Sequence, residues 1–170
     1  HVGHKVIASY IVEFSDLEKV FFIVSPQNPL KKKESLLDQD QRLMIIRMAV
    51  GDNPKLQVSD IEFSMPKPSY TINTLMYLKE EHPENEYVLI MGADNLKFFH
   101  KWKNYEQILE NYSIYVYSRP GVEIGYSHKN IQIIEGAPQM DISASFIRKS
   151  IKRKKNVSYL MPEKAWQYID

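Results

Sequence analysis

Short, continuously apolar segments alternate with amphipathic helical segments along this chain of 170 residues. The clearest apolar segment covers residues 87–91 and ends at Gly92, and another covers residues 20–24 and ends at Ser25 and Pro26. Such uninterrupted runs are typical of strands that are buried on both faces of a parallel sheet. Parallel strands need crossover connections, and the helical segments supply them. The alternation therefore predicts an α/β fold with an open, mainly parallel sheet and helices on both faces.

Shorter elements continue the same pattern. Strands are expected at residues 56–58, 113–117 and 131–134, and helices after His4 and at residues 38–50, 71–81, 105–109, 145–151 and 162–169. Asp38 is a suitable N-cap and Gly51 a suitable stop for the second of these helices. No repeat or linker interrupts the pattern, so we expect a single domain over residues 1–170. Because an α/β domain ordinarily places a buried strand before its first helix, we also expect a first strand upstream of His1.

The composition excludes several classes of protein. A formal net charge of +1 is far from the basic balance of a protein that coats nucleic acid, so affinity for phosphates must come from a local site. Cysteine is absent, which excludes a disulfide framework and a thiolate metal site and fits a cytoplasmic protein. No apolar run approaches the roughly 20 residues that span a bilayer. We therefore expect neither nucleic acid nor a membrane as partner, and a homo-oligomer stays open.

The first candidate site segment is H-V-G-H at residues 1–4. His1 and His4 are three residues apart at a helix start, so they point to the same side, and Gly3 between them lets an anion approach the backbone. Imidazoles placed there can donate hydrogen bonds to charge that develops on phosphate oxygens. The pair lacks a nearby third metal ligand, so no protein metal site is predicted. Taken alone, it is equally consistent with a disordered terminus or a tag remnant.

A second candidate segment lies near the other end of the chain and reads I-S-A-S-F-I-R, residues 142–148. Ser143 and Ser145 can cap the helix that follows, and Arg148, one turn in, returns to the same end. A guanidinium grips two phosphate oxygens at once, which suits the departing pyrophosphate of a nucleoside triphosphate. A simple cap with a solvated arginine is the structural alternative.

The two segments together resemble the paired signatures of the HxGH nucleotidyltransferase superfamily. In that family the first motif closes a longer one, G-x-F-x-P-x-H-x-G-H, whose earlier part would precede His1. The resemblance implies a Rossmann-like nucleotidyltransferase fold and catalysis by His1, His4 and Arg148. It also implies that ATP is bound by Gly3, His4, Gly92, Asp94, Ile142, Ser143, Ser145 and Arg148.

The middle of the chain indicates the acceptor. P-S-Y-T-I-N-T-L at residues 68–75 resembles the P-S-Y-T-x-x-T-L segment of bacterial nicotinate mononucleotide adenylyltransferases. M-G-A-D-N-L at residues 91–96 is similar to their strand end, with Trp102 downstream, and S-R-P-G at residues 118–121 resembles their turn. The order of these motifs matches over the whole chain. The resemblance implies an acceptor site formed by Asn28, Lys32, Ser69, Tyr70, Thr71, Trp102 and Arg119.

The chemistry of these residues agrees with the resemblance. Trp102 can stack on the flat, electron-poor nicotinate ring, and N–H groups at the helix start near Tyr70 and Thr71 can hold its carboxylate. Core packing and capping are the structural alternatives for the same residues. Asp94 is expected to accept hydrogen bonds from ribose hydroxyls, and Arg119 to reach the acceptor phosphate or a carbonyl. Lys31 stands where the family often has histidine, which puts in doubt any role for a neutral imidazole there.

The resemblance implies transfer of AMP from ATP to nicotinate mononucleotide, a step of NAD biosynthesis, and the residues are consistent with direct in-line attack. Mg²⁺ is expected to be bound mainly by substrate phosphates and water. Phosphopantetheine adenylyltransferase is the alternative enzyme, although it does not explain the P-S-Y-T segment or the R-P-G turn. A silent module that binds NAD-type nucleotides is the alternative outside catalysis.

Overall fold

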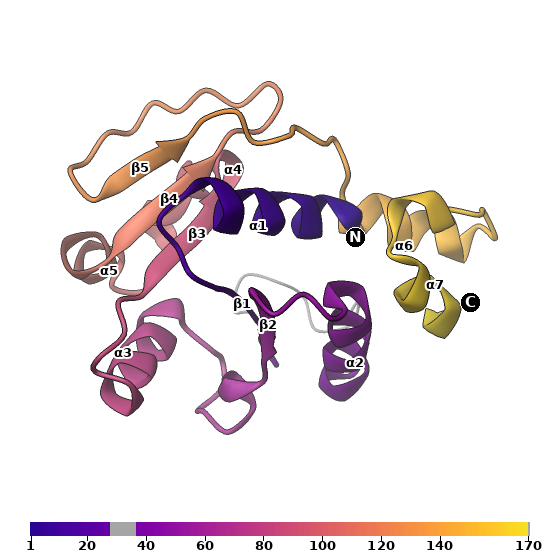
Figure 1. Cartoon of the computed structure of the whole chain (residues 1–170), viewed down its shortest axis with the longest axis horizontal. Coiled ribbons are helices and arrows are strands. Elements are labelled where there is room, and N and C mark those ends of the chain that lie inside the picture. The colour runs from indigo at the N-terminus through magenta and orange to yellow at the C-terminus, as the bar shows by residue number, and fades with distance from the viewer. Residues whose placement is uncertain (28–36, 170) are drawn as a thin grey trace. The chain divides into compact units, whose positions relative to one another are not determined.

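The structure is a computed structural model that describes residues 1–27 and 37–169 (Figure 1). Within these residues the chain divides into two compact units. The first unit comprises residues 1–25, 37–63 and 140–169, and the second comprises residues 26–27 and 64–139. Among the described residues, no helix combines the length and the apolar character needed to cross a membrane.

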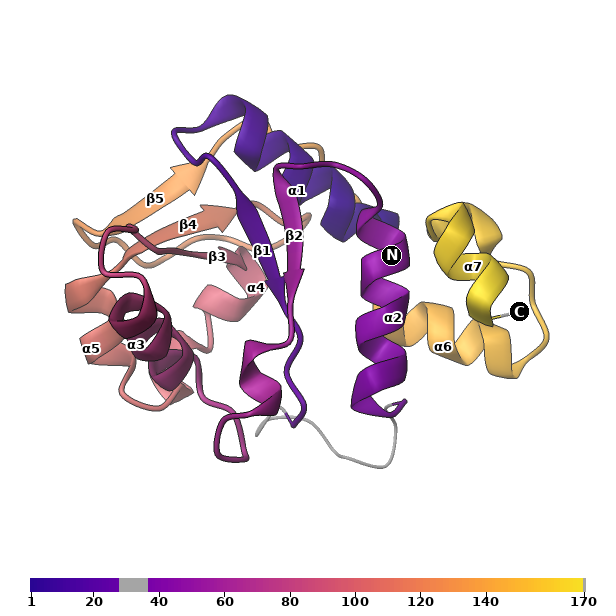
Figure 2. The same ribbon diagram turned by 60° about the horizontal axis from the view of Figure 1, so that its bottom comes forward.

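The first unit combines a pair of parallel strands with helices from both ends of the chain. Its elements are α1 (Val2–Phe14), β1 (Val20–Ile23), α2 (Gln39–Val50), β2 (Leu56–Ser59), η2 (Ile61–Phe63), α6 (Ala144–Lys152), η4 (Ser158–Leu160) and α7 (Glu163–Ile169). β1 and β2 pair in parallel, with Val20 opposite Leu56, and the two arrows lie side by side in Figure 2. α2 packs against both β2 and α7, so the end of the chain is part of this unit's core.

Local sequence explains where these helices begin and end. Asp38 caps α2 as expected, because its Oδ1 accepts a hydrogen bond of 2.9 Å from the backbone N–H of Asp40. Gly51 ends α2 with a φ of 70°, a conformation that disfavours residues with a side chain. α1 begins at Val2 rather than after His4, so the H-V-G-H segment forms its cap and first turn.

The second unit is a three-stranded parallel sheet with helices packed against it. Its elements are α3 (Thr71–Glu81), β3 (Val88–Gly92), α4 (Ala93–Leu96), η3 (Phe99–Lys101), α5 (Tyr105–Asn111), β4 (Ser113–Tyr117) and β5 (Ile131–Ile134). The strand order is β3-β4-β5, with Gly92 opposite Tyr117 at the end of the first pair. α4 was not expected, because four residues are too few to show a helical period.

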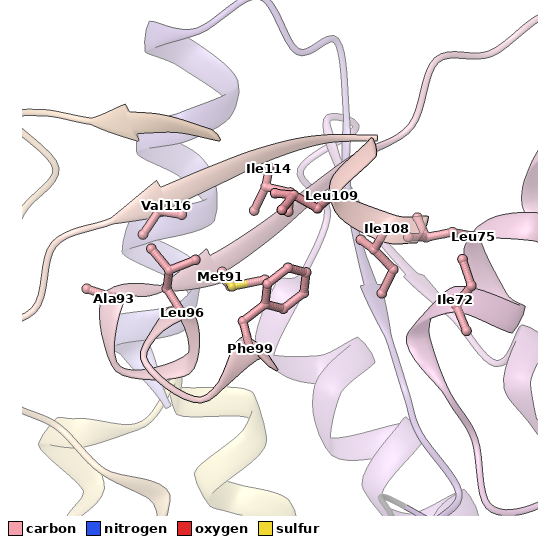
Figure 3. Close-up of a cluster of buried hydrophobic side chains, with 10 residues drawn as sticks. All are labelled: Ile72, Leu75, Met91, Ala93, Leu96, Phe99, Ile108, Leu109, Ile114 and Val116. Carbon is pink, nitrogen blue, oxygen red and sulfur yellow. The ribbon is translucent and has the colours of Figure 1, made fainter. Parts of the chain in front are cut away.

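One apolar cluster forms the core of the second unit (Figure 3). Its side chains come from the strands β3 and β4 and from the helices that follow or precede them. The buried members are Ile72, Leu75, Met91, Ala93, Leu96, Phe99, Ile108, Leu109, Ile114 and Val116. Burial of each of these side chains larger than alanine stabilises the fold by about 1.5–3 kcal/mol, so this cluster holds the ends of β3 and β4 in place.

The α/β class and the parallel pairing are confirmed, and the sheets are flanked by helices. The described strands form two hydrogen-bonded sheets, a division that the pattern of apolar runs did not predict. The prediction of a single domain is not tested by this division and stays a prediction.

Candidate functional site

The start of α1 brings the two histidines of the first motif together. The rings of His1 and His4 stack with their centroids 4.0 Å apart and their planes 20° from parallel. His1 is half-buried and His4 is exposed, and the backbone N–H of His4 donates to the carbonyl of His1 at 3.2 Å. The expectation that both side chains point to the same side is therefore confirmed, and the stacked pair stands at a helix N-terminus.

Gly3 connects this first turn to the segment that precedes α6. It is buried, and a Cβ atom at this position would lie 3.1 Å from Nδ1 of His1 and 3.8 Å from Cβ of Met140. A side chain would therefore press on the His1 ring and fill the space beside Met140. Met140 comes two residues before Ile142, so the segment that leads into the second motif passes beside the first motif within the first unit.

The start of α6 presents a set of hydrogen-bonding groups. Oγ of Ser143 caps the helix by accepting a 3.1 Å hydrogen bond from the N–H of Phe146. Ser145 lies inside the helix, so the prediction that it caps the helix is wrong. Its Oγ instead accepts a 3.2 Å hydrogen bond from a terminal nitrogen of Arg148, which confirms that the arginine returns to this end. Ile147 is buried and anchors the helix, whereas Ser143, Ser145 and Arg148 are exposed and Ile142 is half-buried.

In the second unit, the end of β3 requires a glycine. A Cβ atom on Gly92 would lie 2.5 Å from Oδ1 of Asp94 and 3.1 Å from the ring of Tyr117. Asp94 then stands in the first turn of α4, where its Oδ1 lies 3.4 Å from Nε of Arg119. These two atoms are shielded from solvent and pair as ions without the geometry of a hydrogen bond. Two residues with separate expected roles therefore contact each other.

The start of α3 carries the residues expected to bind the acceptor ring. Tyr70 caps α3, and its carbonyl accepts hydrogen bonds from the N–H groups of Asn73 and Thr74 at 3.0 and 3.2 Å. Its phenol side chain makes no capping hydrogen bond to the first turn. Ser69 is 8% exposed, and within the described part of the chain its hydroxyl has no hydrogen-bond partner. Burial of a polar group without a partner costs free energy, and a substrate that hydrogen-bonds to this hydroxyl would remove that cost.

Trp102 lies against the same core cluster as Tyr70. It is half-buried and meets Phe99 edge-on, with ring centroids 5.5 Å apart and planes at 65°. The next residue, Lys103, holds its Nζ 4.4 Å from the centroid of the Tyr70 ring. The fold therefore gathers the loop after η3 and the start of α3 in one place, as a shared acceptor site requires.

Three of the residues named from the sequence cannot be placed, and two residues near the site were not named from the sequence. Asn28, Lys31 and Lys32 lie outside the described residues. The sequence reasoning did not single out Lys103 or Tyr117. Their positions offered a signal, because Lys103 directly follows Trp102, and Tyr117 ends a strand two residues before Arg119.

The comparisons with known proteins identify the family of this chain. The model of the cytidylyltransferase-like family matches residues 1–150. A protein of Flavobacterium johnsoniae named "Probable nicotinate-nucleotide adenylyltransferase" is 53% identical over 175 residues, which cover 100% of this chain and 90% of the relative. A protein of the same name from Bacteroides thetaiotaomicron is 38% identical over 171 residues, which cover 99% of this chain and 84% of the relative.

A solved structure supports the fold. The nicotinic acid mononucleotide adenylyltransferase of Plasmodium falciparum, complexed with NaAD, matches 99% of this chain and 87% of its own with a TM-score of 0.79. Sequence identity to it is 16%, so this likeness concerns the fold alone. Sequence and fold lead to one assignment: the chain belongs to the cytidylyltransferase-like family and, within it, to the nicotinate-nucleotide adenylyltransferases.

Proposed function

We propose that this chain transfers AMP from ATP to nicotinate mononucleotide, which gives nicotinate adenine dinucleotide and pyrophosphate for NAD biosynthesis. The observation that carries the proposal is the approach of Gly3 to Met140. It places the stacked histidines of α1 and the capped start of α6 in the same unit. In this proposal, groups that donate to phosphates would therefore come from both ends of the chain, which a lone helix start does not provide.

The reaction in this proposal is a single displacement. An oxygen of the acceptor phosphate attacks the α-phosphorus of ATP and forms a new P–O bond, while the bond to the β-phosphate oxygen breaks and pyrophosphate leaves with its electrons. No protein nucleophile takes part. Catalysis then depends on positioning and on donors that stabilise charge in the transition state. His1 and His4 would donate to oxygens of the α-phosphate, and Arg148 with the start of α6 would hold the departing phosphates.

In this proposal, Mg²⁺ binds as a complex with ATP. The described residues bring no three histidine, aspartate or glutamate side chains together in an arrangement that could hold a metal ion. Phosphate oxygens and water supply the ligands that Mg²⁺ prefers, and the ion shields the charge of the triphosphate.

The second unit would hold the ring and ribose parts of the substrates. The half-buried Trp102 would stack on the nicotinate ring, and the N–H groups at the start of α3, near Tyr70 and Thr71, would bind its carboxylate. Only Oδ1 of Asp94 is shielded by Arg119, while the side chain as a whole is 48% exposed. The rest of that carboxylate would accept hydrogen bonds from ribose hydroxyls of ATP. Both substrates are small molecules, and we place the reaction in the cytoplasm, where ATP is abundant.

The test is a comparison of acceptors with the purified protein. ATP and Mg²⁺ are supplied with nicotinate mononucleotide, nicotinamide mononucleotide or phosphopantetheine, and pyrophosphate and the adenylylated product are measured. We expect turnover with nicotinate mononucleotide to exceed that with the other two. Preference for phosphopantetheine would establish the alternative enzyme, and binding without pyrophosphate release would establish a silent module. Inversion at an α-phosphorus made chiral with sulfur and oxygen isotopes would support in-line attack, and retention would contradict it.

A further inference from the structure

A lysine that the motifs do not include stands beside the acceptor ring site. Nζ of Lys103 lies 4.4 Å from the centroid of the Tyr70 ring. Tyr70 is the residue that caps α3, and Trp102, which precedes the lysine, is half-buried against the same core cluster. The ring attracts the ammonium through its negative face and so keeps the charge close to the helix start.

The charge of Lys103 is available to a ligand. Within the described ranges, this side chain forms no ion pair with an aspartate or glutamate and no hydrogen bond. An ammonium group has three donors, and contact with one ring face leaves donors directed elsewhere. Lys103 itself is exposed, so these donors are accessible.

A second observation concerns the hydrogen-bonding groups at the start of α3. The hydroxyl of Ser69, one residue before Tyr70, is buried and has no partner among the described residues. The first N–H groups of α3 also lack a side-chain cap. An ammonium group, a hydroxyl without a partner among the described residues and helix N–H groups are each suited to a carboxylate, because all of them can donate to its oxygens.

We propose that Lys103 is a specificity-determining residue that selects the acid over the amide form of the pyridine mononucleotide. The proposal rests on the function proposed above and adds a residue to it. Nicotinate carries a carboxylate, which accepts a charge-assisted hydrogen bond from the ammonium. Nicotinamide carries a neutral amide whose N–H₂ group is itself a hydrogen-bond donor. In this site the N–H₂ group would face the donors of the protein and form no hydrogen bond with them, which disfavours the amide.

The ratio of kcat/KM for the two acceptors isolates the effect of Lys103 on the substituent of the pyridine ring. Both mononucleotides carry the same positively charged ring and the same phosphate, so any influence of Lys103 on those groups cancels. The measured quantity is kcat/KM for nicotinate mononucleotide divided by kcat/KM for nicotinamide mononucleotide, at saturating ATP. We expect Lys103→Met, which keeps most of the stem and removes the charge, to lower this ratio about tenfold. That is the lower end of what a hydrogen bond to a charged group contributes, because the lysine is exposed.

Two variants control the measurement. Lys101 is an exposed lysine two residues earlier, with its Nζ 5.3 Å from the Phe98 ring, so it has the same kind of contact outside the acceptor site. Lys101→Met should leave the ratio within about twofold of the wild type, as expected for a solvent-exposed charge. Lys103→Arg keeps the charge and the ring contact and should retain most of the preference.

The outcomes separate the two proposals. If the wild type prefers the acid and Lys103→Met keeps the full preference, Lys103 is not the selecting residue and the proposed function stands. An equal fall of the ratio in Lys101→Met would show a general charge effect and would also overturn the assignment. If the wild type forms no dinucleotide from either mononucleotide, the proposed function itself fails. Thermal unfolding of each variant, followed by circular dichroism, shows whether the fold is retained.

Discussion

Nε of Arg119 lies 3.4 Å from Oδ1 of Asp94, and the two residues follow neighbouring parallel strands. Asp94 stands just after β3 and Arg119 just after β4, where the register sets Gly92 opposite Tyr117. The arginine side chain is 24% exposed and the aspartate side chain 48%. An ion pair this accessible contributes at most about 1 kcal/mol to the free energy of unfolding. We therefore expect the pair to orient the carboxylate more than to stabilise the fold.

A double-mutant cycle tests this coupling. We expect Asp94→Ala to lower kcat/KM for ATP about 10- to 100-fold, because hydrogen bonds to a charged group are lost. Arg119→Ala should have a smaller effect on this constant for ATP, since it frees the carboxylate without removing it and Arg119 itself is expected to act on the acceptor. The double variant should then be no worse than Asp94→Ala alone. Additive losses in steady-state kinetics would mean that Arg119 acts on a substrate by itself.

The exposed histidine of the first turn of α1 is expected to act in the transition state. His4→Ala should lower kcat by a factor of about 10²–10³, the usual cost of one transition-state donor. Because His4 is exposed, its loss should leave the fold intact. The measurement is the rate of pyrophosphate release at saturating substrates. His100→Ala, at another exposed histidine, is the control and should retain wild-type turnover. Equal rates in the two variants would remove His4 from the mechanism.

Gly3→Ala separates activity from stability. Alanine is favoured over glycine inside a helix by about 1 kcal/mol, so local propensity alone predicts a more stable α1. The new Cβ would lie 3.1 Å from Nδ1 of His1, so the His1 ring must shift. We expect kcat to fall while the melting temperature stays equal or rises, since a side-chain ring can move aside. Gly125→Ala is the control, because a Cβ there meets no atom within 4 Å. Unchanged kcat in Gly3→Ala would show that the ring position does not matter.

Arg148→Lys should not behave as a conservative change. Lysine offers a point charge in place of the planar fork that grips two phosphate oxygens. We expect KM for ATP to rise and kcat to fall, with little change in the Kd of nicotinate mononucleotide measured by calorimetry. Arg153→Lys, at an exposed arginine beyond the same helix, should leave both substrates unaffected. Similar losses for ATP and for the mononucleotide would make Arg148 a structural residue.

Trp102→Ala tests how the acceptor is recognised. Stacking depends on the ring and not on its substituent, so kcat/KM should fall by a similar factor for nicotinate and nicotinamide mononucleotides. In the wild type the acid should be preferred at least about 10²-fold, the cost of a mismatch at a buried polar site. The two acceptors are compared at saturating ATP. If Trp102→Ala loses only the preference for the acid, the tryptophan contacts the substituent of the ring and not the ring alone.

The sequence by itself determined the strands and the longer helices, and it predicted the chemistry of the motifs. Apolar runs predicted the strands at residues 113–117 and 131–134 with the bounds observed, and helix signals placed α3 correctly. Asp38 and Ser143 were both identified as caps. Each of these features depends on residues within one or two turns of the chain, where periodicity and capping act. Residue types also predicted candidate donors for phosphates.

Only the tertiary structure decided which distant residues meet. Gly3 faces Met140, Lys103 lies over Tyr70, and Arg119 pairs with Asp94 across two strands. The division of the strands between two sheets was likewise decided only by the tertiary structure. Such contacts depend on the path of the chain and on the packing of side chains over tens of residues. Local patterns carry no information about that path, because one side-chain pattern satisfies its own helix or strand equally well beside many different neighbours.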